Sequence, residues 1–162
     1  MASFHHSGYV REEAAKRLNR ITTGIEIPFL LIRLDDWVSS VRDAAQKAIN
    51  SRLDPAYCRS LITNLALIAR LEATAKVHSE PIIKGIKELL LSPECQSGLS
   101  EALGSSDRFI RRASFRLAIN SKGRNLSEVL RQALNDSDFC STQVLIEQPS
   151  QPRYFRNSLC LP

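Results

Sequence analysis

Three arginines at a regular spacing are the residues of this chain best suited to binding a ligand. Arg108, Arg112 and Arg116 lie four residues apart, so they share one face of an α-helix with 3.6 residues per turn. Like charges at this spacing repel one another slightly, and the face therefore needs either solvent or an anionic partner. The spacing predicts an anion-binding face, with a plain solvated surface as the competing interpretation.

A second set of arginines occupies equivalent positions in three similar segments. Arg11 and Arg42 lie 31 residues apart, each preceded by valine and followed by an alanine-rich stretch, and Arg111 begins a looser third copy. A fixed period in this range is typical of stacked structural units. Because a catalytic arginine is needed only once, recurrence in three units favours a structural role for these side chains.

No pattern of catalytic or metal-binding residues accompanies the arginines. The chain contains no G-x-S-x-G, P-loop or HExxH motif. Its adjacent acidic pairs, Glu12-Glu13 and Asp35-Asp36, point apart on a helix and suit concerted acid–base chemistry poorly. The three histidines, at positions 5, 6 and 78, show no metal-ligand spacing. The sequence therefore predicts a protein that is not an enzyme and that has no cofactor and no metal.

Composition is consistent with a globular chain that stays out of the membrane. The 162 residues are 43% hydrophobic, enough for a buried core, and the net charge of +5 permits anionic partners without requiring them. No apolar run approaches the roughly 20 residues of a membrane helix, and residues 1–8 lack the apolar core that is expected of a secretory signal. The four cysteines, at 58, 95, 140 and 160, form no C-x-x-C. We expect reduced thiols in a cytoplasmic protein.

The elements that must position the arginines are all predicted to be helices. Proline follows a polar residue at Asp54-Pro55, Glu80-Pro81 and Ser92-Pro93, which suits the first helical turn, and Asp54 and Ser92 can cap it. Apolar residues then recur at helical spacing, and no segment is typical of a strand. The expected helices cover residues 8–21, 27–34, 37–51, 55–71, 81–91, 93–103, 107–120 and 126–134.

Paired in order, these helices form about four antiparallel hairpins. We expect a leader at 1–7, a repeat array at 8–139 and an irregular tail at 140–162, because the period is lost after Phe139. Trp37 and Phe109 occupy the turns before two units and are predicted to pack between hairpins. Neither end of the array has an obvious polar cap, so end-to-end association of copies of the chain is a further hypothesis.

The segment 27–45 resembles the short HEAT-like repeat of the phycobilisome-lyase type. It carries a small apolar residue, proline, leucines, aspartates at a turn, then Val-Arg and alanines, as in Ile27-Pro28-Phe29-Leu30 and Val41-Arg42-Asp43-Ala44-Ala45. The resemblance implies an all-α solenoid, a right-handed superhelix whose second helices line a concave side that holds a protein partner. It also implies a structural ladder in which the recurring arginines pair with turn aspartates: Arg11, Arg42 and Arg111 with Asp35, Asp36, Asp107 and Asp138.

On the implied concave side, charges of both signs are expected. Arg59, Arg70 and Arg131 are the candidate partner-binding residues, and they stand against the acidic residues Glu26, Glu101 and Glu128. The predicted function is a non-enzymatic scaffold for protein–protein interaction. A nucleic-acid-binding protein, similar to the HEAT-like DNA alkylation-repair enzymes, is the alternative. A bilin lyase, as in the family that the repeat resembles, is third.

Overall fold

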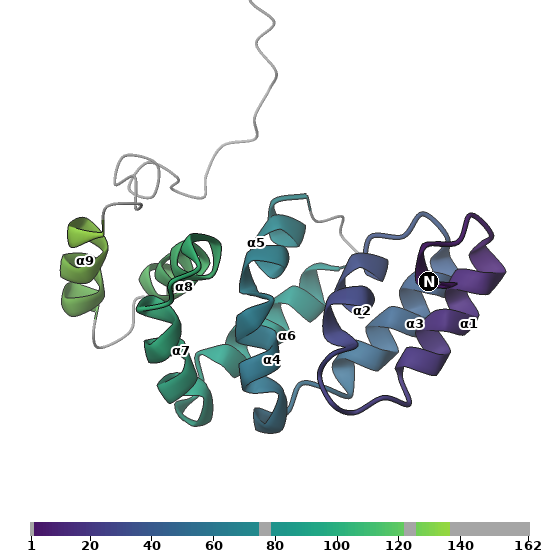
Figure 1. Ribbon diagram of the computed structural model, residues 1–162, viewed down its shortest axis with the longest axis horizontal. Helices are drawn as coiled ribbons and strands as arrows, with labels where there is room; N and C mark the ends of the chain where they lie inside the picture. The colour runs from purple at the N-terminus through teal and green to yellow at the C-terminus, as the bar shows by residue number, and fades with distance from the viewer. Residues whose placement is uncertain (1, 75–78, 122–125, 137–162) are drawn as a thin grey trace, which may run out of the picture.

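All regular structure that is described is helical. The computed structural model describes residues 2–74, 79–121 and 126–136, and no strand occurs within these ranges. The helices follow one another along the long axis of the molecule, with α1 at one end and α9 at the other (Figure 1). The expectation of an all-α protein is therefore confirmed for this part of the chain. The tail predicted at 140–162 lies outside the described residues.

Every helix expected from the sequence is present, and the differences lie mainly at the ends. The elements are η1 (Ala2–Phe4), α1 (Gly8–Leu18), α2 (Ile27–Arg33), α3 (Ser39–Asn50), η2 (Pro55–Tyr57), α4 (Cys58–Thr63), α5 (Leu65–Thr74), α6 (Glu80–Leu90), η3 (Pro93–Cys95), α7 (Gln96–Leu103), α8 (Arg108–Asn120) and α9 (Leu126–Asn135). The helix expected over 55–71 is interrupted at Asn64, whose amide donates to the carbonyl oxygen of Ser60 at 2.8 Å. The break divides it into α4 and α5.

Two aspartates begin helical segments by capping them. Asp54 accepts a hydrogen bond from the backbone N–H of Ala56 at 2.9 Å, and Asp107 accepts one from Phe109 at 2.8 Å. Both therefore satisfy donors that the first turn of a helix leaves unpaired. The prediction of a cap at Ser92 is wrong, because its side chain makes no capping hydrogen bond.

Each α-helix packs on others that lie near it in the sequence. Helix α1 packs on α3 and α3 on α6, whereas α2 packs on α3 and α5, and α4 packs on α6 and α7. Helix α8 lies against α5, α7 and α9. One apolar cluster runs through these contacts from Ala15 to Leu117, so neighbouring units share a continuous core. Val41 is fully buried, but the equivalent Val10 and Ile110 are only half-buried.

A buried ion pair joins the first three α-helices. The Nε atom of Arg52 donates to Oε1 of Glu26 at 2.5 Å, and both residues are 1% exposed. The same guanidinium also donates to the carbonyl oxygens of Ala48 and Ile21, each at 2.5 Å. These acceptors lie at the end of α3 and just beyond the end of α1. Glu26 is thus a buried partner of Arg52, which corrects its expected place on a concave surface.

Removal of Arg52 should destabilise the protein strongly. Arg52→Met leaves Glu26 as an uncompensated buried charge, and we expect the free energy of unfolding to fall by about 3–5 kcal/mol. In Arg59→Met, which removes an exposed arginine of α4, the change should stay within about 0.5 kcal/mol. Adding Glu26→Leu to Arg52→Met should restore part of the loss. Urea unfolding followed by circular dichroism measures all three, and equal losses in Arg52→Met and Arg59→Met would contradict the assignment.

A disulfide joins the second and third hairpins. Cys58, at the start of α4, is bonded to Cys95, at the end of η3, and their Cα atoms lie 5.6 Å apart. Both cysteines are buried. The expectation of reduced thiols is wrong for this pair, because two cysteines 37 residues apart in the sequence are brought together where α4 packs on α7. Cys140 and Cys160 lie outside the described residues.

The disulfide should contribute measurably to stability. Opening a loop of this length restores chain entropy to the unfolded state worth about 3–4 kcal/mol. A reducing agent should therefore lower the denaturation midpoint of the wild-type protein. The double variant Cys58→Ala/Cys95→Ala should start from a lower midpoint and should not respond to the reducing agent. A midpoint of the wild type that is the same with and without reductant would contradict this expectation.

Candidate functional site

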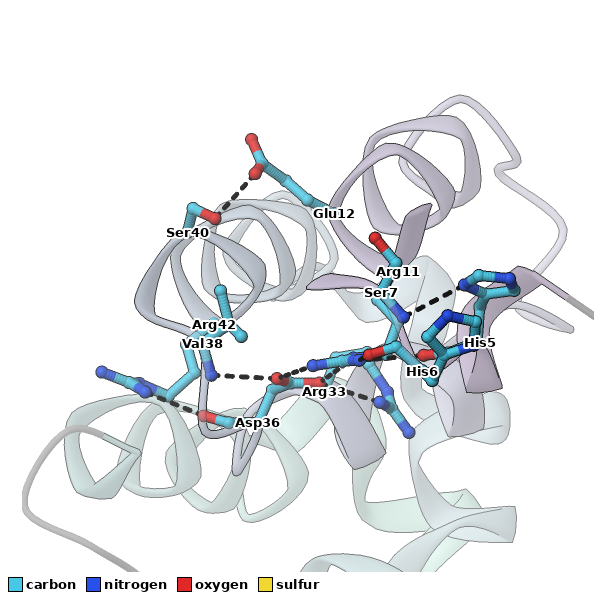
Figure 2. Close-up of polar contacts among 10 residues, drawn as sticks. All are labelled: His5, His6, Ser7, Arg11, Glu12, Arg33, Asp36, Val38, Ser40 and Arg42. Carbon is cyan, nitrogen blue, oxygen red and sulfur yellow. Dashed lines mark hydrogen bonds and ion pairs between the residues drawn. The ribbon is translucent and has the colours of Figure 1, made fainter. Parts of the chain in front are cut away.

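The ladder predicted for the first repeat is present and centres on Asp36. Arg11 holds this carboxylate with two hydrogen bonds, from Nε to Oδ2 at 2.8 Å and from Nη2 to Oδ1 at 2.9 Å (Figure 2). Arg33 donates to Oδ2 at 2.8 Å, and the backbone N–H of Val38 donates to Oδ1 at 3.0 Å. The remaining donor of Arg11, Nη1, holds the carbonyl oxygens of the leader residues His5 and His6 at 2.8 Å. Asp36 therefore ties α1, α2 and the turn before α3 together.

The same arrangement recurs at α8 with a different aspartate from the one expected. Arg111 forms an ion pair with Asp136 and donates from Nη1 to the carbonyl oxygen of Ser105 at 2.5 Å. In both cases the carboxylate lies 25 residues after the arginine. In both cases a backbone carbonyl that accepts from the arginine lies six residues before the arginine. Asp107 caps α8 instead of pairing with Arg111, which corrects the predicted ladder. The constant offset of 25 was the signal in the sequence that identifies Asp136.

The middle arginine keeps only half of this arrangement. Arg42 donates from Nη1 to the backbone carbonyl oxygen of Asp36, six residues earlier, at 2.8 Å. The residue 25 positions later is Leu67, which offers no carboxylate. Asp36, and not Asp35, is the carboxylate that Arg11 contacts. Of the other predicted partners, Asp138 lies outside the described residues.

The environment of Asp36 makes its ionised form part of the folded state. Burial by itself would raise the pKa of this carboxyl. Hydrogen bonds from Arg11 and from the N–H of Val38, together with the positive charge of Arg11 and a hydrogen bond from Arg33, outweigh burial and lower the pKa below its ordinary value of 3.8. Since the folded pKa is the lower one, the stabilisation is complete above about pH 4 and is lost as the pH falls through the folded value.

This linkage gives a testable dependence of stability on pH. Asp36→Asn should lower the free energy of unfolding at pH 7 by about 3–5 kcal/mol, because it leaves two guanidinium groups without their carboxylate. The wild type should lose stability between pH 4 and pH 2 more steeply than Asp36→Asn does. Asp43→Asn, on the exposed face of α3, is the matched control and should follow the wild type. Parallel curves for Asp36→Asn and the wild type would contradict the linkage.

Three of the six predicted binding arginines meet in a groove between α5 and α8, which lie side by side in Figure 1. Each helix contributes four residues at the spacing i, i+3, i+4 and i+7, so each presents one face to the groove. The groove has a volume of about 240 Å³. We call it the α5–α8 groove, and its lining is Ala66, Ala69, Arg70, Ala73, Phe109, Arg112, Ala113 and Arg116.

The groove joins residues that the sequence assigned to opposite sides of the molecule. Arg70 was predicted on the concave side, whereas Arg112 and Arg116 belonged to a separate anion-binding face. All three side chains are exposed and line the same groove. Arg108 shares their face of α8 but does not line the groove, and its guanidinium lies 4.8 Å from the ring centroid of Phe109.

The other two candidate partner-binding arginines lie elsewhere. Arg59 is exposed on α4 and does not line the groove. Arg131 forms an exposed ion pair with Glu128 of its own helix at 2.7 Å. The prediction that Trp37 and Phe109 pack between hairpins is wrong, because they are 77% and 57% exposed. Trp37 instead lies beside the guanidinium of Arg11, with 5.5 Å between the guanidinium carbon and the ring centroid.

The lining of the groove is chemically suited to holding an anion. It consists of alanine methyl groups, one aromatic ring and three guanidinium groups, and none of these can transfer a proton at neutral pH. Among the residues that the structure describes, no cluster of three or more histidine, cysteine, aspartate or glutamate side chains is placed to hold a metal ion. In the same part of the chain, no helix has both the length and the apolar character needed to cross a membrane.

Comparison with known proteins adds no relative to this description. A scan against protein-family models, a search of curated proteins and a search of solved structures each found no match. The α5–α8 groove is therefore interpreted from its own residues.

Proposed function

We propose that this protein is a non-enzymatic interaction module, a short HEAT-like α-solenoid that binds a protein partner through the α5–α8 groove. The observation that carries the proposal is the groove itself, where an alanine-lined floor lies between arginines from two helices. Packing of α1 on α3 and α3 on α6, beside a second set of contacts through α2, α4, α5 and α7, supports the stacked arrangement. We propose in addition that the helices form four hairpins and that these hairpins are wound into a right-handed superhelix.

Nucleic-acid binding is the second candidate, and the four exposed arginines at the groove and on α8 favour it. It ranks lower because the basic face of α8 is short. From Arg108 to Arg116 the helix rises about 12 Å, and the nearby Lys87 is already paired with Glu72 at 2.6 Å. A duplex offers a phosphate every few ångströms along a much longer path. No described residue favours the bilin lyase, which stays the third hypothesis.

Crosslinking from within the groove tests the proposal. A photoreactive amino acid at Ala73, which is exposed on α5, should capture a protein from cell extract. The same probe at Asp43 on α3 should not capture it. Capture should fall at least fivefold when Arg70 and Arg116 are both replaced by glutamate, because the partner then meets like charge. A groove probe that yields only nucleic acid, or a partner captured equally from both positions, would contradict the proposal.

Two further predictions about the protein remain as proposals. End-to-end association is consistent with the exposure of Tyr9 on α1, at 87%, and of Leu134 on α9, at 65%. A cytoplasmic location also stays a proposal. The Cys58–Cys95 disulfide argues against it, since structural disulfides persist mainly in oxidising compartments.

A further inference from the structure

We infer that the partner segment held by the α5–α8 groove is acidic, a short stretch with carboxylates on either side of an apolar side chain. This inference rests on the proposed function and names the chemistry of the partner at the same groove. Carboxylates would meet Arg70 on one wall and Arg116 on the other. The apolar side chain would lie on the alanines beside Phe109.

The positive charge of the groove favours an acidic partner. Three guanidinium groups line it, and no carboxylate does. In the part of the chain that is described, neither Arg70 nor Arg116 forms an ion pair with an acidic side chain. A guanidinium presents a planar set of donors that matches both oxygens of a carboxylate. Arg70 and Arg116 therefore present donors for which an acidic peptide supplies the acceptors.

The shape and size of the groove favour a short peptide segment. Ala66, Ala69 and Ala73 follow one another on the face of α5, and Ala113 faces them from α8. Side chains this small let a peptide approach closely. The lined stretch of each helix is eight residues from first to last, a rise of about 10 Å. This length matches about three extended residues or two turns of a helix. Phe109 is 57% exposed at one end, so an apolar side chain would gain contact there.

The surroundings argue against a longer anionic polymer. Beyond Arg116, the adjoining cavity is lined by Glu72 and Lys87, which neutralise each other. At this end the described charges therefore cancel, and the basic stretch of α8 from Arg108 to Arg116 rises only about 12 Å, which suits two or three carboxylates better than a continuous phosphate backbone.

Fluorescence anisotropy with defined probes tests this inference. The acidic probe is a labelled 12-residue peptide built from Glu-Glu-Leu repeats, and the matched probe has glutamine in place of every glutamate. We expect the acidic peptide to bind at least tenfold more tightly than the glutamine peptide. Its affinity should also fall as salt rises from 50 to 200 mM, because exposed charge pairs are screened. A labelled 12-nucleotide single strand is measured beside them.

Variants locate the binding. Arg70→Gln/Arg116→Gln removes one charge from each wall and should weaken the acidic peptide at least tenfold. Arg20→Gln/Arg59→Gln removes two exposed arginines outside the groove and should change the affinity less than twofold. Phe109→Ala should weaken binding of the leucine-containing peptide about threefold. The thermal midpoint of each variant should match that of the wild type. If the midpoint of Arg70→Gln/Arg116→Gln is lower, Arg70→Lys/Arg116→Lys is measured in its place and should bind the acidic peptide with intermediate affinity.

The outcomes separate this inference from the proposed function. Equal binding of the acidic and glutamine peptides, or equal losses in the two double variants, would overturn the inference. Tighter binding of the single strand than of the acidic peptide, lost in Arg70→Gln/Arg116→Gln, would also overturn it and would assign the groove to phosphate. If the groove crosslinker captures a protein that contacts it through a neutral or basic segment, the proposed function stands and the inference alone fails.

Discussion

Buried guanidinium groups at the junctions between helices hold this molecule together. Helix ends leave backbone carbonyls without partners, and burying them unpaired is costly. Arg52 resolves this where α1, α2 and α3 meet, since its donors reach four backbone carbonyls and one buried carboxylate, that of Glu26. Arg11 on α1 and Arg111 on α8 each join a carboxylate and a backbone carbonyl in the same way. Because each guanidinium contacts several elements at once, it fixes their relative positions.

One helix, α8, contacts neighbouring elements with some of its side chains and lines the α5–α8 groove with others. Successive residues of a helix point about 100° apart. On α8, Arg111 turns toward Asp136 and the carbonyl of Ser105, while its neighbour Arg112 lines the α5–α8 groove. The ion pair of Arg111 stabilises the position of α8, and that position in turn brings Arg112 and Arg116 opposite Arg70. The groove is thus a consequence of how the units are joined.

The disulfide adds a covalent link at the centre of the array. Cys58 and Cys95 join the beginning of α4 to the residues just before α7, two elements that also pack on each other. Helix α5 continues from α4 across the break at Asn64, and α8 follows α7. The link therefore joins the two segments that precede the groove helices in the sequence, α4 before α5 and η3–α7 before α8.

The sequence was sufficient to predict where the helices lie, but not which charged side chains from different helices pair with one another. Proline after a capping residue and apolar spacing predicted the helices, because caps and amphipathic stripes act within one or two turns. The recurring Arg11 and Arg111 were predicted as structural, yet Asp136 was missed and Asp107 was chosen in its place. Both are turn aspartates, and the offset of 25 residues that points to Asp136 gains its meaning only once the structure shows Arg11 paired with Asp36.

The candidate site divides in the same way. The arginine spacing on α8 was evident from the chain, as was the positive charge of Arg70. Their meeting in one groove was not, because it depends on α5 packing against α8 across some forty residues of sequence. The burial of Glu26 with Arg52 and the pairing of Cys58 with Cys95 have the same cause. By itself the sequence determined the helices and their inward faces. Tertiary packing decided which charged groups became buried partners and which remained available to another molecule, because burial depends on neighbours that are distant in the chain.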